Sequence, residues 1–231
     1  MIENAVIRRG NQRLATENLV KLNFGNLSAI DRRDGIIGIK PSGVDFSALE
    51  DQDIIYLDTS GEIKHKGKYD RASVDFPTHL ELYNGFPEIG SVIHTHSPYA
   101  TAHAQALKPI ECFGTTHADF FKGSVPVVRT LRTEEVQTNY ETNTGKAIVE
   151  FFNTNLISPM DVPACLIPGH GVFLWGRSVK ETLEVAIALE EIARINFATL
   201  ALNPRTPPLD PILIEKHFSR KHGSKSYYGQ A

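Results

Sequence analysis

Two pairs of short predicted strands near the start of the chain restrict its possible folds most, because a tight turn joins the members of each pair. Residues 26–31 and 36–39 flank Arg32-Arg33-Asp34-Gly35, in which Asp-Gly is a turn signal. Residues 54–58 and 62–66 flank Thr59-Ser60-Gly61. Connections this short join antiparallel neighbours, so the sequence predicts two β-hairpins.

Helical segments alternate with strands along the rest of the chain. We predict helices at residues 2–19, 77–86, 98–106, 141–153, 178–201 and 211–222, and further strands at 91–97, 125–130, 164–167 and 171–175. Gly10 is expected to interrupt the first helix, and Ser178 with Glu181 forms a capping-box pair. No repeat or shift in composition divides the 231 residues, so we expect a single domain, 1–231, with a mixed sheet covered by helices.

Charge and cysteine content limit the partners of the chain. A formal net charge of -3 argues against a general affinity for nucleic acid or an anionic membrane, although a local basic pocket could still hold a small anion. The first residues lack the pattern of a signal peptide, and no segment approaches the ~20 apolar residues of a membrane span, so we expect a cytoplasmic protein with a small-molecule substrate. Cys112 and Cys165 lack a Cys-x-x-Cys spacing, which indicates buried thiols.

His94 and His96 are separated by one residue at the end of an apolar segment. Alternate residues of a strand project to the same side, so the two imidazoles should converge. Imidazole is the commonest metal ligand, and zinc accepts it readily. Taken alone, the pair is equally consistent with two polar residues at a strand end.

Two other residues could complete a metal site. His170 lies between Gly169 and Gly171 at a turn between two predicted strands, and Asp75 precedes the predicted helix at 77–86. Three imidazoles and one carboxylate would form a zinc shell of the catalytic kind. The alternatives are that His170 is exposed at the tip of a tight turn and that Asp75 merely stabilises a helix start.

Further polar candidates lie in loops and in the C-terminal tail. Gly25-Asn26 and Ser42-Gly43 could receive an oxyanion, although both are also ordinary turn sequences. Asp119 precedes two phenylalanines and would exchange protons if it were partly desolvated; simple exposure is the alternative. The adjacent Tyr227 and Tyr228 need a partner surface if they are buried.

Taken together, these motifs resemble the L-ribulose-5-phosphate 4-epimerases of the class II aldolase/epimerase superfamily. The likeness runs from the first helix to the last residues, and the order of the motifs makes it specific. The motifs are Gly25-Asn26-Leu27-Ser28, Lys40-Pro41-Ser42-Gly43-Val44-Asp45, Asp75-Phe76-Pro77-Thr78-His79, His94-Thr95-His96-Ser97, Gly114-Thr115-Thr116-His117-Ala118-Asp119, Gly169-His170-Gly171 and Tyr227-Tyr228-Gly229-Gln230.

The resemblance implies an α/β fold, a single-domain layered α/β/α arrangement with a central, predominantly antiparallel sheet. It also implies a Zn2+ ion held by His94, His96 and His170, with Asp75 at or beside the shell. Asp119 and Tyr228 match a proton-transfer pair that comes from a neighbouring subunit of a homotetramer. His217 and Arg220 match the last helix of the family and would line the interface or the phosphate site. The residues expected to bind the phosphate of the substrate or its neighbouring atoms are Gly25, Asn26, Ser42, Gly43, Ser73 and Val74.

Val74 departs from the family pattern, which usually has two serines before the metal-site acid. One hydroxyl donor to the phosphate is therefore missing, while the backbone amide of Val74 remains. A lost charge-assisted hydrogen bond is worth roughly 1.5–3 kcal/mol, enough to weaken binding about tenfold or more. Alternatively, Val74 marks a different phosphorylated sugar.

The reaction that the resemblance implies is interconversion of L-ribulose 5-phosphate and D-xylulose 5-phosphate by retro-aldol cleavage and re-addition at C3–C4. One alternative is a class II aldolase of the fuculose- or rhamnulose-phosphate type, which would release the aldehyde; those aldolases typically have Glu where Asp75 stands. Another is a metal-stabilised binding protein without turnover. L-arabinose, L-ascorbate and L-xylulose routes all present the same bond to such an enzyme.

Overall fold

A seven-stranded antiparallel sheet forms the centre of the protein. The computed structural model describes residues 2–222 and 226. The sheet order is β4-β3-β2-β1-β5-β7-β6, and every pair of neighbours is antiparallel. The strands are β1 (Asn26–Asp31), β2 (Ile36–Ile39), β3 (Ile55–Asp58), β4 (Ile63–His65), β5 (Ser91–Thr95), β6 (Ala164–Ile167) and β7 (Gly171–Gly176).

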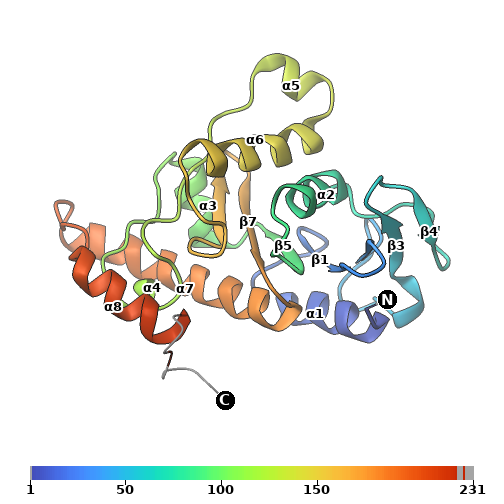
Figure 1. The fold of residues 1–231 in the computed structure, drawn as a ribbon, viewed down its shortest axis with the longest axis horizontal. Coiled ribbons are helices and arrows are strands. Elements are labelled where there is room, and N and C mark those ends of the chain that lie inside the picture. Colours follow the sequence, from blue (N-terminus) through green and yellow to red (C-terminus); the bar gives the residue numbers. More distant parts are fainter. Residues whose placement is uncertain (1, 223–225, 227–231) are drawn as a thin grey trace.

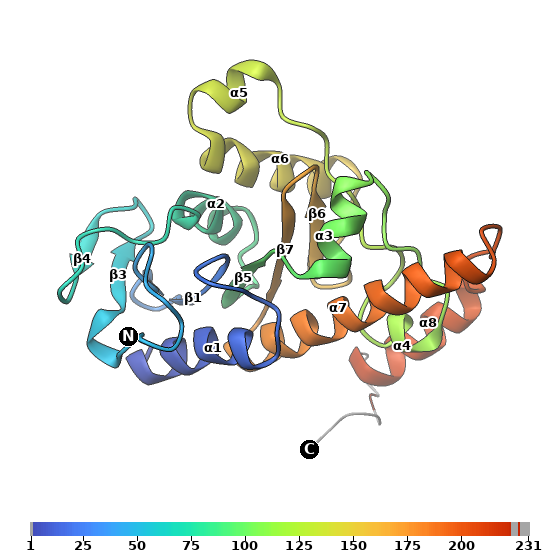
Figure 2. The same ribbon diagram turned by 180° about the vertical axis from the view of Figure 1, so that it is seen from behind.

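Helices cover both faces of this sheet, which gives the α/β/α layering (Figures 1 and 2). The pair α2 and α6 packs over one face, and α1 and α7 pack over the other. The short α4 packs against α8 beside the outer part of α7, and α5 lies beyond α6. The helices are α1 (Asn4–Thr16), the 3-10 turn η1 (Asp51–Asp53), α2 (Phe76–Gly85), α3 (Pro98–Gln105), α4 (Thr115–Ala118), α5 (Thr133–Gln137), α6 (Tyr140–Thr154), α7 (Val179–Leu202) and α8 (Pro211–His222).

Alternation along β1 assigns its side chains to the two helical layers. Ser28 faces α2, where its hydroxyl meets His79 Nδ1 at 2.7 Å and Tyr83 Oη at 2.8 Å. Leu27 faces α1, in which a Cβ added at Gly10 would lie 2.9 Å from Leu27 Cδ1. Gly10 therefore does not interrupt the first helix as expected. It is a close-packing position at which α1 approaches the sheet.

Both predicted hairpins are confirmed, with boundaries that differ by one residue at β3 and β4. The predicted strand at 125–130 is wrong. In this segment Val125 and Val127 make single isolated bridges, to Ile110 and Leu166. Pro126 between them has no amide hydrogen, so a continuous ladder cannot form there.

The longest helix, α7, begins at the predicted cap, Ser178, but the predicted capping box with Glu181 is only half formed. Ser178 Oγ accepts from the amide of Glu181 at 3.2 Å, whereas the Glu181 carboxylate accepts from the amide of Arg177. Within residues 2–222, no helix is both long and apolar enough to cross a lipid bilayer.

The antiparallel order brings several chain segments to one edge of the sheet. The register pairs Asn26 at the start of β1 with His94 near the end of β5. In the same way it pairs Ser28 with Ile39 at the end of β2, and Thr95 with Val172 near the start of β7. The loops before β1, after β2, after β5 and before β7 therefore meet, although up to about 145 residues separate them along the chain.

Candidate metal centre

Three histidines converge at this edge of the sheet. His94, His96 and His170 offer nitrogens that all lie within 4.8 Å of one another. Nε2 of His94 and Nε2 of His96 are 3.0 Å apart. Two ligands in a tetrahedral shell with metal–nitrogen bonds of 2.0–2.1 Å are about 3.3 Å apart, so this spacing is close to that of a metal site.

His94 is held in the tautomer that a metal requires. Its Nδ1 lies 3.0 Å from the carbonyl oxygen of Val172, which can only accept, so Nδ1 carries the proton. The unprotonated Nε2 then points toward His96. Phe173 stacks on the His94 ring at 4.3 Å and an interplanar angle of 16°, which fixes the plane of the ring.

His170 reaches the group from the turn between β6 and β7. Gly169 has φ +65°, a conformation that glycine adopts readily, and a Cβ on Gly171 would lie 2.5 Å from the carbonyl oxygen of Thr95. The two glycines therefore let the turn approach β5. Nδ1 of His170 lies 3.1 Å from the hydroxyl of Tyr140, which leaves its Nε2 as the candidate ligand atom.

Burial favours the neutral form of all three imidazoles. Burial lowers the pKa of His94, His96 and His170 below the ordinary histidine value, although Asp75 opposes the shift at each of them. Neutral imidazole is the form that binds a metal. Three nitrogen donors with converging lone pairs fit a zinc ion, and an open fourth position is typical of catalytic sites.

Asp75 lies at the start of α2, but its side chain makes no capping hydrogen bond to the helix. Instead Asn26 Nδ2 donates to Asp75 Oδ2 at 2.6 Å and to Ser73 Oγ at 2.8 Å. Burial opposes ionisation of Asp75, but the influence of His94 and His79 and the hydrogen bond from Asn26 outweigh it, so the pKa is lowered. The helix-start explanation is therefore insufficient for this carboxylate, which faces the histidine pocket.

An open pocket of about 670 Å³ lies beside the histidines. Most of the residues that the sequence indicated for metal or phosphate line this pocket. Asn26 does not line it, but donates hydrogen bonds to two lining residues, Ser73 and Asp75. Three residues without a role in the sequence prediction also line it. The lining residues are Asn23, Phe24, Gly25, Lys40, Ser42, Gly43, Ser73, Val74, Asp75, His94, His96 and His170.

Lys40 is the most informative of the residues that the sequence prediction missed. It is 1% exposed, and its Nζ donates to the carbonyl oxygen of Pro41 at 3.1 Å. Burial lowers its pKa to about 8, with Asp75 and Asp45 opposing the shift, so the group is still mostly charged at pH 7. A lysine that ends an apolar strand just before Pro-Ser-Gly is the signal that could have identified it.

Backbone amides add to this positive end of the pocket. Gly43 has φ +71°, and within residues 2–222 neither its amide nor that of Val74 makes a hydrogen bond. Together with the Lys40 ammonium group and the hydroxyls of Ser42 and Ser73, these free amides would suit a bound anion. Gly25 lets the chain pass close to β5 in the same region, because a Cβ there would lie 2.6 Å from the carbonyl oxygen of His94.

Asp119 does not line this pocket. It follows α4, is 7% exposed, and its carboxylate is bound by α8. Arg220 donates to it at 2.8 and 3.0 Å, and His217 Nδ1 lies 3.1 Å away. Asp119 is thus buried and ion-paired, and simple exposure does not describe it. Tyr227 and Tyr228 lie outside the described residues.

Comparison with known proteins agrees with these features. Residues 6–197 match the family model described as the Class II Aldolase and Adducin N-terminal domain. Proteins called L-ribulose-5-phosphate 4-epimerase UlaF from Salmonella paratyphi B, Salmonella paratyphi A and Salmonella typhi are each 44% identical to this chain over 220 residues. The alignment covers 95% of this chain and 95% of each relative.

Solved structures share the fold. An L-fuculose 1-phosphate aldolase superposes with a TM-score of 0.79 at 23% identity, over 94% of this chain and 95% of that one. The L-fuculose-1-phosphate aldolase of Thermus thermophilus gives a TM-score of 0.68 at 24% identity, over 89% and 97%. At this level of identity the likeness establishes the architecture and leaves the reaction open.

Proposed function

The chain belongs to the class II aldolase family, and on that premise we propose that it is a zinc-dependent L-ribulose-5-phosphate 4-epimerase. Such an isomerase interconverts L-ribulose 5-phosphate and D-xylulose 5-phosphate. The observation that carries the proposal is the position of the His94–His96–His170 group and of the anion site around Lys40 in one pocket. A phosphorylated sugar that is cleaved in this way needs the metal for the reacting carbons and the anion site for its phosphate.

The bond that changes is C3–C4. The epimerised carbon has no acidic hydrogen, so direct deprotonation cannot invert it, whereas retro-aldol cleavage can. Cleavage gives a three-carbon enediolate and glycolaldehyde phosphate, and re-addition to the other face of the aldehyde restores the bond with C4 inverted. His94, His96 and His170, with Asp75 at or beside them, would hold a zinc ion, which would supply Lewis acidity for the cleavage.

The anion site has the second task, because the aldehyde fragment must turn without leaving. Lys40 and the free amides of Gly43 and Val74 would hold its phosphate, together with the hydroxyls of Ser42 and Ser73. Binding through the phosphate leaves the carbonyl end free to rotate. Loss of the fragment to solvent would make the protein an aldolase.

The proton-transfer groups complete the proposal. A base must take the C4 hydroxyl proton during cleavage and a donor must return one after the turn. We assign these roles to Asp119 and Tyr228 of a neighbouring subunit in a homotetramer. Asp119 lies outside the lining of the metal pocket of its own chain, which supports a site shared between subunits.

An exposed apolar surface near Asp119 also supports the shared site. A hollow of about 700 Å³ is lined by Phe120 of the loop after α4 and by Ile187 and Ala188 of α7. A second copy that covers this surface would bury apolar groups beside Asp119.

We also propose that α8 and the tail belong to one domain with residues 6–197. The ion pair of Arg220 with Asp119 and the packing of α8 on α4 support this. The domain then spans 1–231.

Substitution of His96 by Asn tests the proposal. We expect His96→Asn to lose both bound zinc, measured by elemental analysis, and turnover of L-ribulose 5-phosphate. His65→Asn, at an exposed histidine of the edge strand β4, is the matched control and should keep both. Full turnover by zinc-free protein would contradict the proposal.

A further inference from the structure

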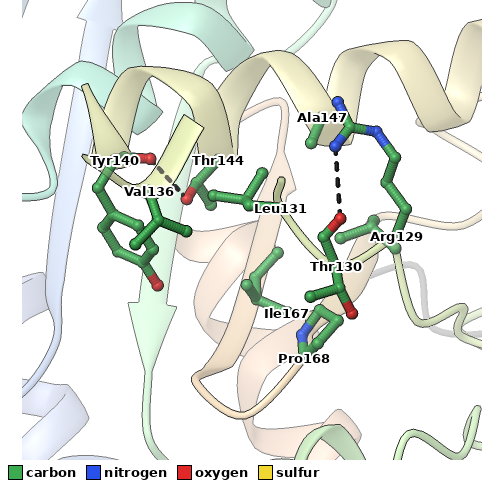
Figure 3. Close-up of a pocket in the computed structure, with 10 residues that line it drawn as sticks. Arg129, Thr130, Leu131, Val136, Tyr140, Thr144, Ala147, Ile167 and Pro168 are labelled. Carbon is green, nitrogen blue, oxygen red and sulfur yellow. Dashed lines mark hydrogen bonds between the residues drawn. The ribbon is translucent and has the colours of Figure 1, made fainter. Parts of the chain in front are cut away.

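Tyr140 stands between the metal pocket and a second hollow. At the start of α6, its hydroxyl lies 3.1 Å from Nδ1 of His170. Its ring also lines a pocket of about 410 Å³ formed by residues 128–131, α6 and the end of β6. In Figure 3 the ring lies beside Val136, and the hydroxyl is at the end of the ring remote from α6. Tyr140 therefore lies between His170, which lines the metal pocket, and the second hollow.

The surrounding segment holds Tyr140 in place. Arg129 donates to both carboxylate oxygens of Glu135, at 2.8 and 2.9 Å, and to Glu150 of α6 at 2.8 Å. Asn143 of α6 donates to the carbonyl oxygen of Glu135 at 2.8 Å. These hydrogen bonds and ion pairs attach the loop that contains α5 to helix α6. Val136 of this loop and Tyr140 line the same hollow (Figure 3).

His170 needs such support more than His94 does. His94 lies on a strand that is buried along its whole length, and a backbone carbonyl accepts from its Nδ1. His170 instead lies in a turn between two glycines and is half-buried. Within residues 2–222, the side-chain partner of its ring nitrogen is the Tyr140 hydroxyl. A histidine that binds a metal through Nε2 carries its proton on Nδ1, and that proton needs an acceptor.

We propose that Tyr140 is a positioning residue, whose hydroxyl accepts from Nδ1–H of His170 and aims Nε2 of that histidine into the metal pocket. The inference rests on the proposed metal site. Groups that accept from the second nitrogen of a metal-binding histidine fix its tautomer and its ring orientation, and their loss typically costs about 10–100-fold in metal affinity. Tyr140 itself is not among the residues that line the metal pocket.

Replacement of Tyr140 by Phe tests the proposal, because it deletes the hydroxyl and keeps the ring that lines the second hollow. The dissociation constant for zinc is measured by competition with a chelator, without substrate. The visible spectrum of the cobalt(II) form reports the geometry around the metal. Tyr99→Phe is the matched control, since Tyr99 is half-buried on α3 against Phe197.

We expect Tyr140→Phe to raise the zinc dissociation constant about tenfold or more and to shift the cobalt(II) bands, with the unfolding temperature of the metal-free protein unchanged. Tyr99→Phe should match the wild type in all three measurements. Wild-type zinc affinity and an unchanged cobalt spectrum in Tyr140→Phe would overturn the inference while leaving the proposed function intact. Weaker binding with a lower metal-free unfolding temperature would show a structural role and also overturn it. A wild-type protein that binds no zinc would overturn both proposals.

Discussion

Lys40 combines two properties that rarely occur together, a charged end group and almost complete burial. Its ammonium group is 5.1 Å from the centre of the Phe46 ring and bonds the Pro41 carbonyl. Desolvation costs this residue stability, and the anion site offers a reason for keeping it. A bound phosphate would restore the opposite charge that the folded chain alone supplies only in part.

The lowered pKa of Lys40 predicts a pH dependence of substrate binding. The ammonium is present at pH 7 and is lost as the pH rises through about 8, well below the ordinary lysine value of 10.5. We therefore expect KM for the sugar phosphate to rise above about pH 8. Lys40→Met should raise KM at pH 7 by about tenfold or more and abolish this step.

The measurement is KM from steady-state kinetics across this pH range, for the wild type and for Lys40→Met. Because the folded state resists charging Lys40, the methionine variant should unfold at no lower temperature at pH 7. Identical KM profiles for the two proteins would show that Lys40 does not hold the phosphate.

Val74 offers a second prediction at this scale. Its side chain is 63% exposed in the lining of the anion site, so a serine there should leave stability unchanged. If the substrate carries the phosphate expected of the family, Val74→Ser adds a hydroxyl donor and lowers KM by up to about tenfold. An unaltered KM would indicate another substrate.

At the scale of elements, strands with turn or glycine signals were predictable and contacts between distant segments were not. The hairpin β1–β2 follows from its Asp-Gly turn. The pairing of β1 with β5 joins residues more than 60 positions apart, and no local pattern encodes it. The convergence of the histidines depends on this pairing, so spacing along the chain could suggest the metal site but could not assemble it.

The misjudged elements have local causes. α4 and α5 contain four and five residues, too few for a helical period to be visible. The false strand contains Pro126, whose missing amide outweighs the β-branched residues around it. Lys40 was overlooked because a lysine next to a turn is usually exposed, and no local pattern shows that the folded loop buries it beside Phe46.

Contacts between α2 and the sheet support the candidate metal centre on the α2 side of the sheet. His79 packs edge-on to Phe173 at 5.8 Å, and Phe173 stacks on His94. Ser28 connects His79 to Tyr83 through its hydroxyl. All these side chains are buried, so His79 Nδ1 and the Tyr83 hydroxyl both depend on Ser28 for a partner.

Removal of the central hydroxyl should therefore be costly. Ser28→Ala leaves a buried imidazole nitrogen and a buried phenol without this partner, and we expect the free energy of unfolding to fall by about 2 kcal/mol. Urea titration of the metal-free protein measures it. Ser219→Ala, which removes an exposed hydroxyl bonded to Glu215, should change the value by less than about 0.5 kcal/mol. Equal stability of the two variants would show that the Ser28 network contributes little.

At the scale of the whole molecule, the proposal assigns the metal and the proton-transfer groups of one active site to different subunits. His96→Asn and Asp119→Asn should each be nearly inactive, for different reasons. When the two are unfolded together and reassembled, about a quarter of the sites should combine an intact metal half with an intact Asp119 half. Turnover should then reappear in the mixture.

Turnover is assayed in the mixture and in each variant that has been unfolded and reassembled alone. A mixture as inactive as its components would show that Asp119 does not serve a neighbouring subunit. Asp119→Asn protein with full zinc content is the internal control, because Asp119 does not line the metal pocket of its own chain.

The proposed reaction requires that the bond between C3 and C4 breaks and re-forms without release of a fragment. Purified zinc-loaded protein is incubated with L-ribulose 5-phosphate, and D-xylulose 5-phosphate and glycolaldehyde phosphate are followed together. We predict that D-xylulose 5-phosphate accumulates to equilibrium while free glycolaldehyde phosphate stays at background. Release of glycolaldehyde phosphate in step with loss of substrate would contradict the account and identify an aldolase.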